Sequence, residues 1–192
     1  TGVVAHEVGH ALGLWHEQSR PDSDCCIRVK AENIYNPHVL LYNFLPQRNN
    51  QVETLDIPFD FGSIMQYGPT AFAQRGQNSI QTNPDGYQRT IGQRDQISFY
   101  DAKFINRAYC QDRCATQLPC LHGGYTHPVG CQRCVCPDGL GGVVCELNEP
   151  PKNALCGGVI ELISESTEIE SPGFPNPGFG LDVKCSWVIR VE

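Results

Sequence analysis

Two histidines and a glutamate near the start of the chain have the spacing of a metal site. His6 and His10 are four residues apart, so on a helix both side chains lie on one face. Two imidazoles placed in this way can bind one metal ion, and Glu7 between them can reach a water molecule on that ion. Gly13 tolerates a left-handed backbone conformation, which can end the helix and turn the chain back. The turn would bring His16 to the same ion, and three nitrogen ligands with one open position are typical of catalytic zinc.

A helix whose histidines serve only packing is the alternative, because apolar residues such as Val8 surround them. The longer string HExxHxxGxxH fixes five residue types, and its glycine has a mechanical role in turning the chain. This string therefore favours a metal site over packing. Glu17 follows His16 directly, and the complete string HExxHxxGxxHE resembles the zinc motif of astacin-type metallopeptidases, a branch of the metzincins.

The stretch GSIMQYG, at residues 62–68, resembles the Met-turn of the same family. A lone methionine is ordinarily a core residue, but the resemblance implies that Met65 forms an apolar floor beneath the zinc ligands. It also implies that Tyr67 donates to the oxyanion of the reaction, and that Glu17 supports the site by contacting the mature N-terminus rather than the metal. Gln66 stands where the family usually has histidine, at a position that is not a ligand.

Composition argues against several classes of partner. The net charge is −7 and no run of Lys or Arg occurs, so we expect no nucleic acid and no anionic membrane as partner. No apolar stretch is long enough for a membrane span. Eleven cysteines, most of them clustered, point to an oxidising extracellular compartment, so we expect a secreted protein. Thr1 leads directly into a helix without a secretion signal, and we expect a fragment that lacks the N-terminal half of its catalytic domain.

We expect an α+β fold class with three parts, in an order similar to that of nematode astacins. Residues 1–110 would be the C-terminal part of an astacin-like peptidase domain that starts at the zinc-binding helix. A second helix is predicted near its end, where Ser98 and Asp101 form a capping box and apolar residues follow at helical spacing. Residues 111–146 would be an EGF-like domain, 147–155 a proline-stiffened linker, and 156–192 the truncated start of a CUB domain.

The second part has the cysteine spacing of a small disulfide-bonded module, with Cys114, Cys120, Cys131, Cys134, Cys136 and Cys145. A zinc knuckle at Cys131 and Cys134 is the alternative, but His122 and His127 do not complete a ligand set at the usual spacing. A C-x-C pair followed by a glycine-rich turn and a final cysteine resembles an EGF-like domain instead. That resemblance implies the pairs Cys114–Cys131, Cys120–Cys134 and Cys136–Cys145. The segment 111–113 is a poor match to the calcium-binding form, so we predict no calcium there.

Residues 156–192 alternate short apolar and polar runs, which predicts antiparallel β-structure. Their Cys-Gly-Gly start, the SPGFPNPGF turn and the Cys-Ser-Trp sequence resemble the opening of a CUB domain, which implies the pair Cys156–Cys185. The family resemblance implies that Cys110 pairs with a cysteine upstream of this chain. The resemblance assigns no role to Cys25 and Cys26, and adjacent cysteines rarely bridge each other without strain.

The resemblance implies a secreted zinc metalloendopeptidase with one Zn²⁺ per catalytic domain. Glu7 would activate a zinc-bound water to hydrolyse peptide bonds of extracellular proteins, such as matrix or cuticle components, while the EGF-like and CUB modules bind protein partners. Alternatives are a binding protein built on a dead protease scaffold, and another metzincin of the matrix-metalloprotease type. The intact set of site residues favours the enzyme, and Glu17 together with Tyr67 argues for the astacin type.

The helix would expose apolar side chains on faces suited to packing against a sheet upstream of this chain, namely Val3, Val4, Val8 and Ala11. We therefore expect residues 1–192 on their own to be inactive, in spite of an intact set of zinc ligands.

Overall fold

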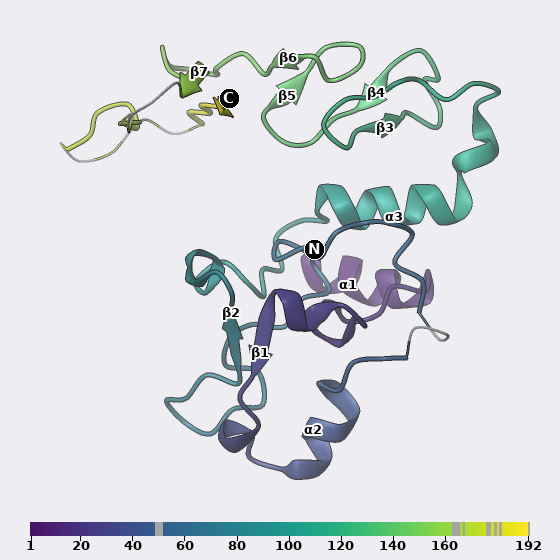
Figure 1. Ribbon diagram of the computed structural model, residues 1–192, viewed down its shortest axis with the longest axis vertical. Helices are drawn as coiled ribbons and strands as arrows, with labels where there is room; N and C mark the ends of the chain where they lie inside the picture. The colour runs from purple at the N-terminus through teal and green to yellow at the C-terminus, as the bar shows by residue number, and fades with distance from the viewer. Residues whose placement is uncertain are drawn as a thin grey trace. The chain divides into compact units, whose positions relative to one another are not determined.

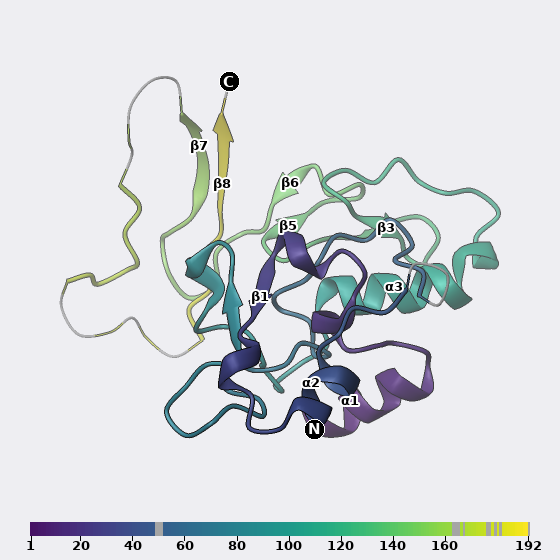
Figure 2. The same cartoon turned by 60° about the horizontal axis from the view of Figure 1, so that its bottom comes forward.

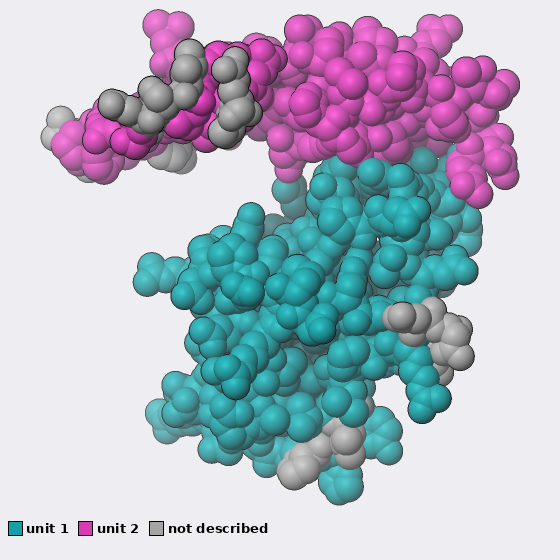
Figure 3. Space-filling model, viewed as in Figure 1, with its two compact units in different colours: residues 1–110 teal, residues 111–192 magenta. Residues whose placement is uncertain are grey.

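Figure 1 presents a computed structural model of the chain, which describes residues 1–48, 52–162, 166, 168–175, 178, 180 and 182–191. The chain divides into two compact units, Thr1–Cys110 and Gln111–Glu192 (Figure 3). The longest described helix has 11 residues, and no helix among the described residues is long and apolar enough to cross a membrane.

Helices and one small sheet organise the first unit (Figures 1 and 2). The α-helices are α1 (Gly2–Ala11), α2 (Pro37–Asn43) and α3 (Phe99–Tyr109). Strand β1 (Ile27–Val29) pairs antiparallel with β2 (Ile80–Thr82), so that Ile27 lies opposite Thr82. Short 3₁₀ turns connect these elements, namely η1 (Glu17–Ser19), η2 (Ser23–Cys25), η3 (Ala31–Asn33) and η4 (Asp85–Tyr87), and η5 (Gln111–Arg113) opens the second unit.

The first helix ends as its sequence predicts. α1 stops at Ala11, and Gly13 adopts φ +90°, a conformation that a side chain would strain. The Tyr109 hydroxyl, at the end of α3, donates a hydrogen bond of 2.8 Å to the Leu12 carbonyl. The two helices that begin and end this unit therefore meet at the turn that follows α1. On the exposed side of α1, Val3, Val4, Val8 and Ala11 face solvent, as expected.

The apolar core of the first unit lies around the β1–β2 pair and contains Ile27, Ile34, Phe44, Ile80 and Ile91. Phe44 follows α2 directly, while Ile34 and Ile91 come from connecting segments without regular structure of any length. Burial of these apolar side chains therefore holds the irregular segments in place, rather than hydrogen bonds between paired strands. Strands of three residues, such as β1 and β2, are too short to show a period in the sequence.

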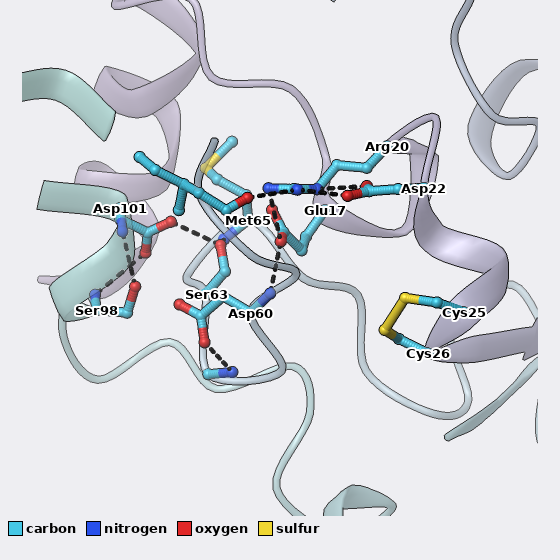
Figure 4. A network of polar contacts seen from close by, with 12 residues as sticks. Glu17, Arg20, Asp22, Cys25, Cys26, Asp60, Ser63, Met65, Ser98 and Asp101 are labelled. Atoms are coloured by element: carbon cyan, nitrogen blue, oxygen red, sulfur yellow. Dashed lines mark hydrogen bonds and ion pairs between the residues drawn. A yellow bond between two sulfur atoms is a disulfide. The ribbon is translucent and has the colours of Figure 1, made fainter. Parts of the chain in front are cut away.

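The capping box at the start of α3 is confirmed, and it extends into the Met-turn (Figure 4). The Ser98 hydroxyl accepts from the Asp101 amide at 2.9 Å, and the Asp101 carboxylate accepts from the Ser98 amide at 3.1 Å. The same carboxylate also accepts from the Ser63 hydroxyl at 2.7 Å and from the Ile64 amide at 2.8 Å. Asp101 is only 5% exposed, so one buried carboxylate holds both the helix start and the turn.

The second unit contains three two-stranded pairs within its described residues. Strands β3 (Tyr125–Thr126) and β4 (Cys134–Val135) pair antiparallel, as do β5 (Leu140–Gly141) and β6 (Leu147–Asn148). The structure forms the bridges Cys114–Cys131, Cys120–Cys134, Cys136–Cys145 and Cys156–Cys185, which are the pairs that the family resemblances imply. Strands of two residues cannot bury a core, so these bridges carry most of the constraint on the chain in this part.

The third pair differs from the expected antiparallel arrangement. Strands β7 (Gly158–Leu162) and β8 (Trp187–Val191) run parallel, as Figure 2 shows. Each strand begins two residues after one half of the Cys156–Cys185 bridge, so the bridge brings the two strand starts together and both leave in the same direction. The segment that joins them exceeds the dozen residues that a parallel connection requires. The expectation of antiparallel pairing was therefore wrong for these strands. Part of the SPGFPNPGF turn, at residues 176, 177 and 179, lies outside the described residues.

Two cysteine assignments also come from the structure. Cys25 and Cys26 are joined to each other, with an S–S distance of 2.05 Å, although bridges between neighbours are uncommon. A regular strand would point neighbouring side chains to opposite faces, but Cys25 ends η2 and Cys26 lies between that turn and β1. Cys110 has no disulfide partner in the part of the chain that the structure describes.

The buried carboxylate of Asp101 yields a test of stability. Replacing Asp101 by Ala would leave the buried Ser63 hydroxyl and Ile64 amide without their acceptor, so we expect a loss of about 3 kcal/mol or more in unfolding free energy. Ser98→Ala is the comparison variant, because it removes the cap and a side-chain bond to Asp60 but keeps the Asp101 carboxylate at the Met-turn, and it costs about 1 kcal/mol. Denaturant unfolding of the full-length protein measures both, and equal losses would contradict the proposed link to the Met-turn.

Candidate metal centre

Three imidazoles from α1 and from the chain after its terminal turn converge in the first unit. His6, His10 and His16 each offer a ring nitrogen, and these three atoms lie within 4.8 Å of one another. The ring centroids are 4.6 to 5.4 Å apart, and the Nε2 atoms of His10 and His16 are separated by 3.2 Å. Glu7 is exposed on α1 between the first two, and its carboxylate has no hydrogen-bond or ion-pair partner among the described residues.

Backbone carbonyls set the orientation of two of these rings. The Nδ1 atom of His6 lies 2.8 Å from the Ile64 carbonyl, and Nδ1 of His10 lies 2.9 Å from the Leu14 carbonyl. A carbonyl only accepts, so Nδ1 carries the hydrogen in both rings and Nε2 keeps its lone pair. An outer hydrogen bond of this kind is what holds a metal-binding histidine in place.

The donor set fits a zinc ion. Burial, followed by the neighbouring His10 and His6, lowers the pKa of His16 to about 4, so its ring is neutral at pH 7 and can act as a ligand. Three neutral imidazoles that leave a coordination position open match the preference of catalytic zinc. The geometry therefore agrees with the spacing argument from the sequence, because the turn at Gly13 brings His16 back to the other two.

Met65 lies directly against the helix that carries two of the histidines. It is 1% exposed, and a Cβ atom placed on Gly9 would come within 3.0 Å of its sulfur. Gly9 therefore permits the close approach of the Met-turn to α1 between His6 and His10. The Met65 carbonyl also accepts from the Glu17 amide at 3.2 Å, which joins the turn to the segment after His16.

Tyr67 packs its ring against His16, with centroids 4.4 Å apart. Its hydroxyl lies 3.5 Å from the Asn43 side-chain oxygen at the end of α2, and its amide donates to Gln18 at 3.3 Å. Burial raises the pKa of the Tyr67 phenol, so the group keeps its proton at neutral pH and remains a donor. Asn43 and Gln18 were not identified from the sequence, because neither belongs to a motif and both reach Tyr67 from distant segments.

Glu17 is held in a buried polar network beside the site (Figure 4). Its carboxylate accepts from the Asp60 amide at 2.7 Å and lies 3.5 Å from the Arg20 guanidinium. Burial raises the pKa of Glu17 to about 8, although Arg20 and the bond from Asp60 act in the opposite direction. Arg20 in turn binds Asp22 through two hydrogen bonds of 2.9 and 2.8 Å and donates to the Ile57 carbonyl at 2.7 Å. The structure thus places Glu17 between the chain after His16 and the loop before the Met-turn.

Gln66 is fully buried on the Met-turn and does not reach the three imidazoles by any described contact. Its side-chain nitrogen donates to the Tyr67 carbonyl at 3.0 Å, and its own carbonyl accepts from Arg94 at 3.0 Å. Gln66 therefore bonds within the turn and to Arg94, and the group of three imidazoles does not include it.

Known proteins similar to this chain are zinc proteases. The chain is 50% identical over 193 residues to a protein named zinc metalloproteinase nas-36 from Caenorhabditis elegans, covering all of this chain and 31% of that protein. It is 48% identical over 189 residues to zinc metalloproteinase dpy-31 from Brugia malayi, covering 98% of this chain and 31% of that protein. The chain thus spans about a third of the length of these relatives.

A solved structure and a family model agree with these relatives. High choriolytic enzyme 1, a hatching enzyme zinc-protease from the medaka fish Oryzias latipes, matches with a TM-score of 0.51 and 40% identity, over 56% of this chain and 52% of that one. The model of the astacin peptidase family matches residues 1–110, the unit that contains the three imidazoles. The chain therefore belongs to the astacin family of zinc metallopeptidases.

Proposed function

We propose that this chain carries the zinc site of a secreted endopeptidase that hydrolyses peptide bonds of extracellular proteins, such as matrix or cuticle components. The observation that carries the proposal is the convergence of three imidazoles, two of which have their Nε2 lone pairs left free by bonds to backbone carbonyls. The zinc-protease relatives support the same reaction class. The five disulfides among the described residues favour an oxidising compartment outside the cell.

In this proposal His6, His10 and His16 hold the zinc ion. A zinc ion bound there would supply a Lewis acid that polarises the scissile carbonyl and lowers the pKa of a water molecule. The Glu7 carboxylate takes a proton from the attacking water and passes it to the leaving amine nitrogen, as the new C–O bond forms and the C–N bond breaks. The Glu7 carboxylate is exposed and has no partner among the described residues, which suits this proton transfer.

Tyr67 is the proposed donor to the substrate oxygen as negative charge develops on it. The contact of its ring with His16 places the phenol beside the ligand set, and its raised pKa keeps the proton on the hydroxyl. The long bond to Asn43, at 3.5 Å, is weak, so little is lost when the hydroxyl turns to the substrate. Met65 and Glu17 act as support, the first beneath α1 and the second behind His16.

Residues 111–146 and 156–192 are proposed to be an EGF-like module and the start of a CUB module that bind protein partners. The support is the bridge pattern, in which the first, second and fifth cysteines of residues 114–145 pair with the third, fourth and sixth. Neither module contributes to the imidazole cluster, which lies in residues 1–110.

The role of Glu7 can be separated from metal binding. Glu7→Gln in the full-length protein should keep its zinc but reduce turnover of a fluorogenic peptide by about 10²- to 10⁴-fold, because the amide cannot accept the proton. His16→Ala is the contrasting variant and should lose zinc together with activity. Zinc content measured by mass spectrometry beside the rate distinguishes the two. Parallel loss of zinc and activity in Glu7→Gln would show that the residue is misassigned.

The role of Tyr67 is tested by removing one oxygen atom. Tyr67→Phe keeps the ring that packs on His16 and Phe44, so zinc content and KM should stay close to those of the unchanged protein. Turnover should fall by about two orders of magnitude, since one donor to the developing charge is lost. Phe72→Leu, at another ring beside Tyr67, serves as a packing control. An unchanged kcat in Tyr67→Phe would contradict the assignment.

A further inference from the structure

One disulfide of the first unit differs from the other bridges in the length of chain that it closes. Cys25 and Cys26 are neighbours in the sequence, whereas the four other bridges among the described residues join cysteines 9 to 29 positions apart. A bridge stabilises a fold mainly by limiting the unfolded chain, and this effect grows with the length of the closed loop. The Cys25–Cys26 bridge closes almost no loop, so stabilisation of the fold does not account for it.

The same bridge is also open to solvent, because Cys25 is exposed and Cys26 is half-buried (Figure 4). Each of the three bridges within residues 114–145 has one buried cysteine, and both cysteines of the Cys156–Cys185 bridge are half-buried. The buried ones are Cys114, Cys134 and Cys145. Cys25 is thus the only bridged cysteine that is exposed in the part of the chain that the structure describes. A thiolate must reach a sulfur atom to attack it, so access favours this bridge over the others.

The short span of the bridge follows from its place in the sequence. The Cα atoms of Cys25 and Cys26 are 3.8 Å apart, as in any pair of residues joined by a trans peptide bond. The other four bridges span Cα separations of 5.4 to 5.9 Å, within the usual range for disulfides. A bridge outside that range is reduced more easily. Access and span therefore both point to the same bridge as the first to open.

Backbone hydrogen bonds hold the two cysteines close to each other independently of the bridge. The Cys25 amide donates to the Asp22 carbonyl at 3.3 Å. The Cys26 amide donates to the carbonyl of Ser23 at 3.1 Å, and Ser23 is only 4% exposed. The Cys26 carbonyl accepts from the Asn83 amide at 2.7 Å. The turn can therefore keep its backbone when the S–S bond opens, so the two sulfur atoms stay near enough for the bond to form again.

We propose that the Cys25–Cys26 bridge is a reversible modification site for small extracellular thiols of the glutathione class. The thiolate of such a molecule attacks the Cys25 sulfur, forms a mixed disulfide with it and releases Cys26 as a thiolate, which takes up a proton. A second thiol molecule attacks the outer sulfur of the mixed disulfide, which leaves Cys25 as a thiol and releases the small disulfide. Two small thiols thus supply the two electrons that open the bridge, and the small disulfide closes it by the reverse steps. The proposal does not depend on peptide hydrolysis at the metal centre.

The test compares how fast each bridge opens in the full-length protein. Free thiols are first blocked with N-ethylmaleimide, the protein is treated with graded concentrations of glutathione, and new thiols are labelled with heavy-isotope N-ethylmaleimide and located by peptide mass spectrometry. Cys25 and Cys26 should be labelled about tenfold or more faster than any other bridged cysteine of the chain. Oxidised glutathione, added in place of the second label, should restore the bridge.

Three outcomes of this experiment would overturn the proposal. Another bridge of the chain might open first or at the same rate as Cys25–Cys26. The first reagent might block Cys25 and Cys26, which would mean that they are not joined in the protein. The opened bridge might fail to close with oxidised glutathione, which would contradict its reversibility.

Variants locate the attack. Cys25→Ser with Cys26→Ser should abolish the rapidly labelled species and leave the labelling rates of the other bridges unchanged. Asp24 is an exposed acid next to Cys25 and repels anionic glutathione more than zwitterionic cysteamine. Asp24→Asn should therefore raise the ratio of the rates with glutathione and cysteamine about twofold. Asp112→Asn, an exposed acid in the second unit, is the matched control and should leave that ratio unchanged. Equal ratios in the two variants would contradict an attack at Cys25.

Discussion

The backbone of Ile64 joins the two ends of the first unit, and the imidazole cluster depends on it. Its carbonyl accepts from His6 on α1, and its amide donates to the Asp101 carboxylate at the start of α3. Both bonds are 2.8 Å long and buried, so neither competes with water. A ring on the first helix is thus oriented by a carboxylate 95 positions later in the chain (residue 6 against residue 101), through a single residue of the Met-turn.

The polar network around Arg20 holds the segment that follows His16 in place. Arg20 is 7% exposed, and its guanidinium is distributed over Asp22, the Ile57 carbonyl and the nearby Glu17. Breaking up such a buried group would leave charges without partners, which is costly. The chain that follows the third histidine is therefore fixed on its buried side.

The sequence predicted the parts of this arrangement that depend on local spacing. His6 and His10 share a helical face, Gly13 ends that helix, and Ser98 with Asp101 caps the last one, because each effect is decided within a few residues. The carboxylate of Asp101 also reaches the Met-turn, and no local pattern indicates that contact across the chain. The parallel pairing of β7 with β8 escaped prediction for the same reason, since it joins two segments that are far apart in the chain and lie next to the Cys156–Cys185 bridge. The disulfide between Cys25 and Cys26 depends on an irregular turn that propensities do not describe.

Phe44 packs against Tyr67 and also lines a cavity in the first unit. Its ring centroid lies 5.7 Å from that of Tyr67, with nearly perpendicular ring planes, and the cavity lies beside the β1–β2 pair. The side chain is 1% exposed in a closely packed core, so it cannot change rotamer without displacing a neighbour on one side or the other. The position of the Tyr67 ring therefore depends on the packing of Phe44, and through it on the apolar core around the β1–β2 pair.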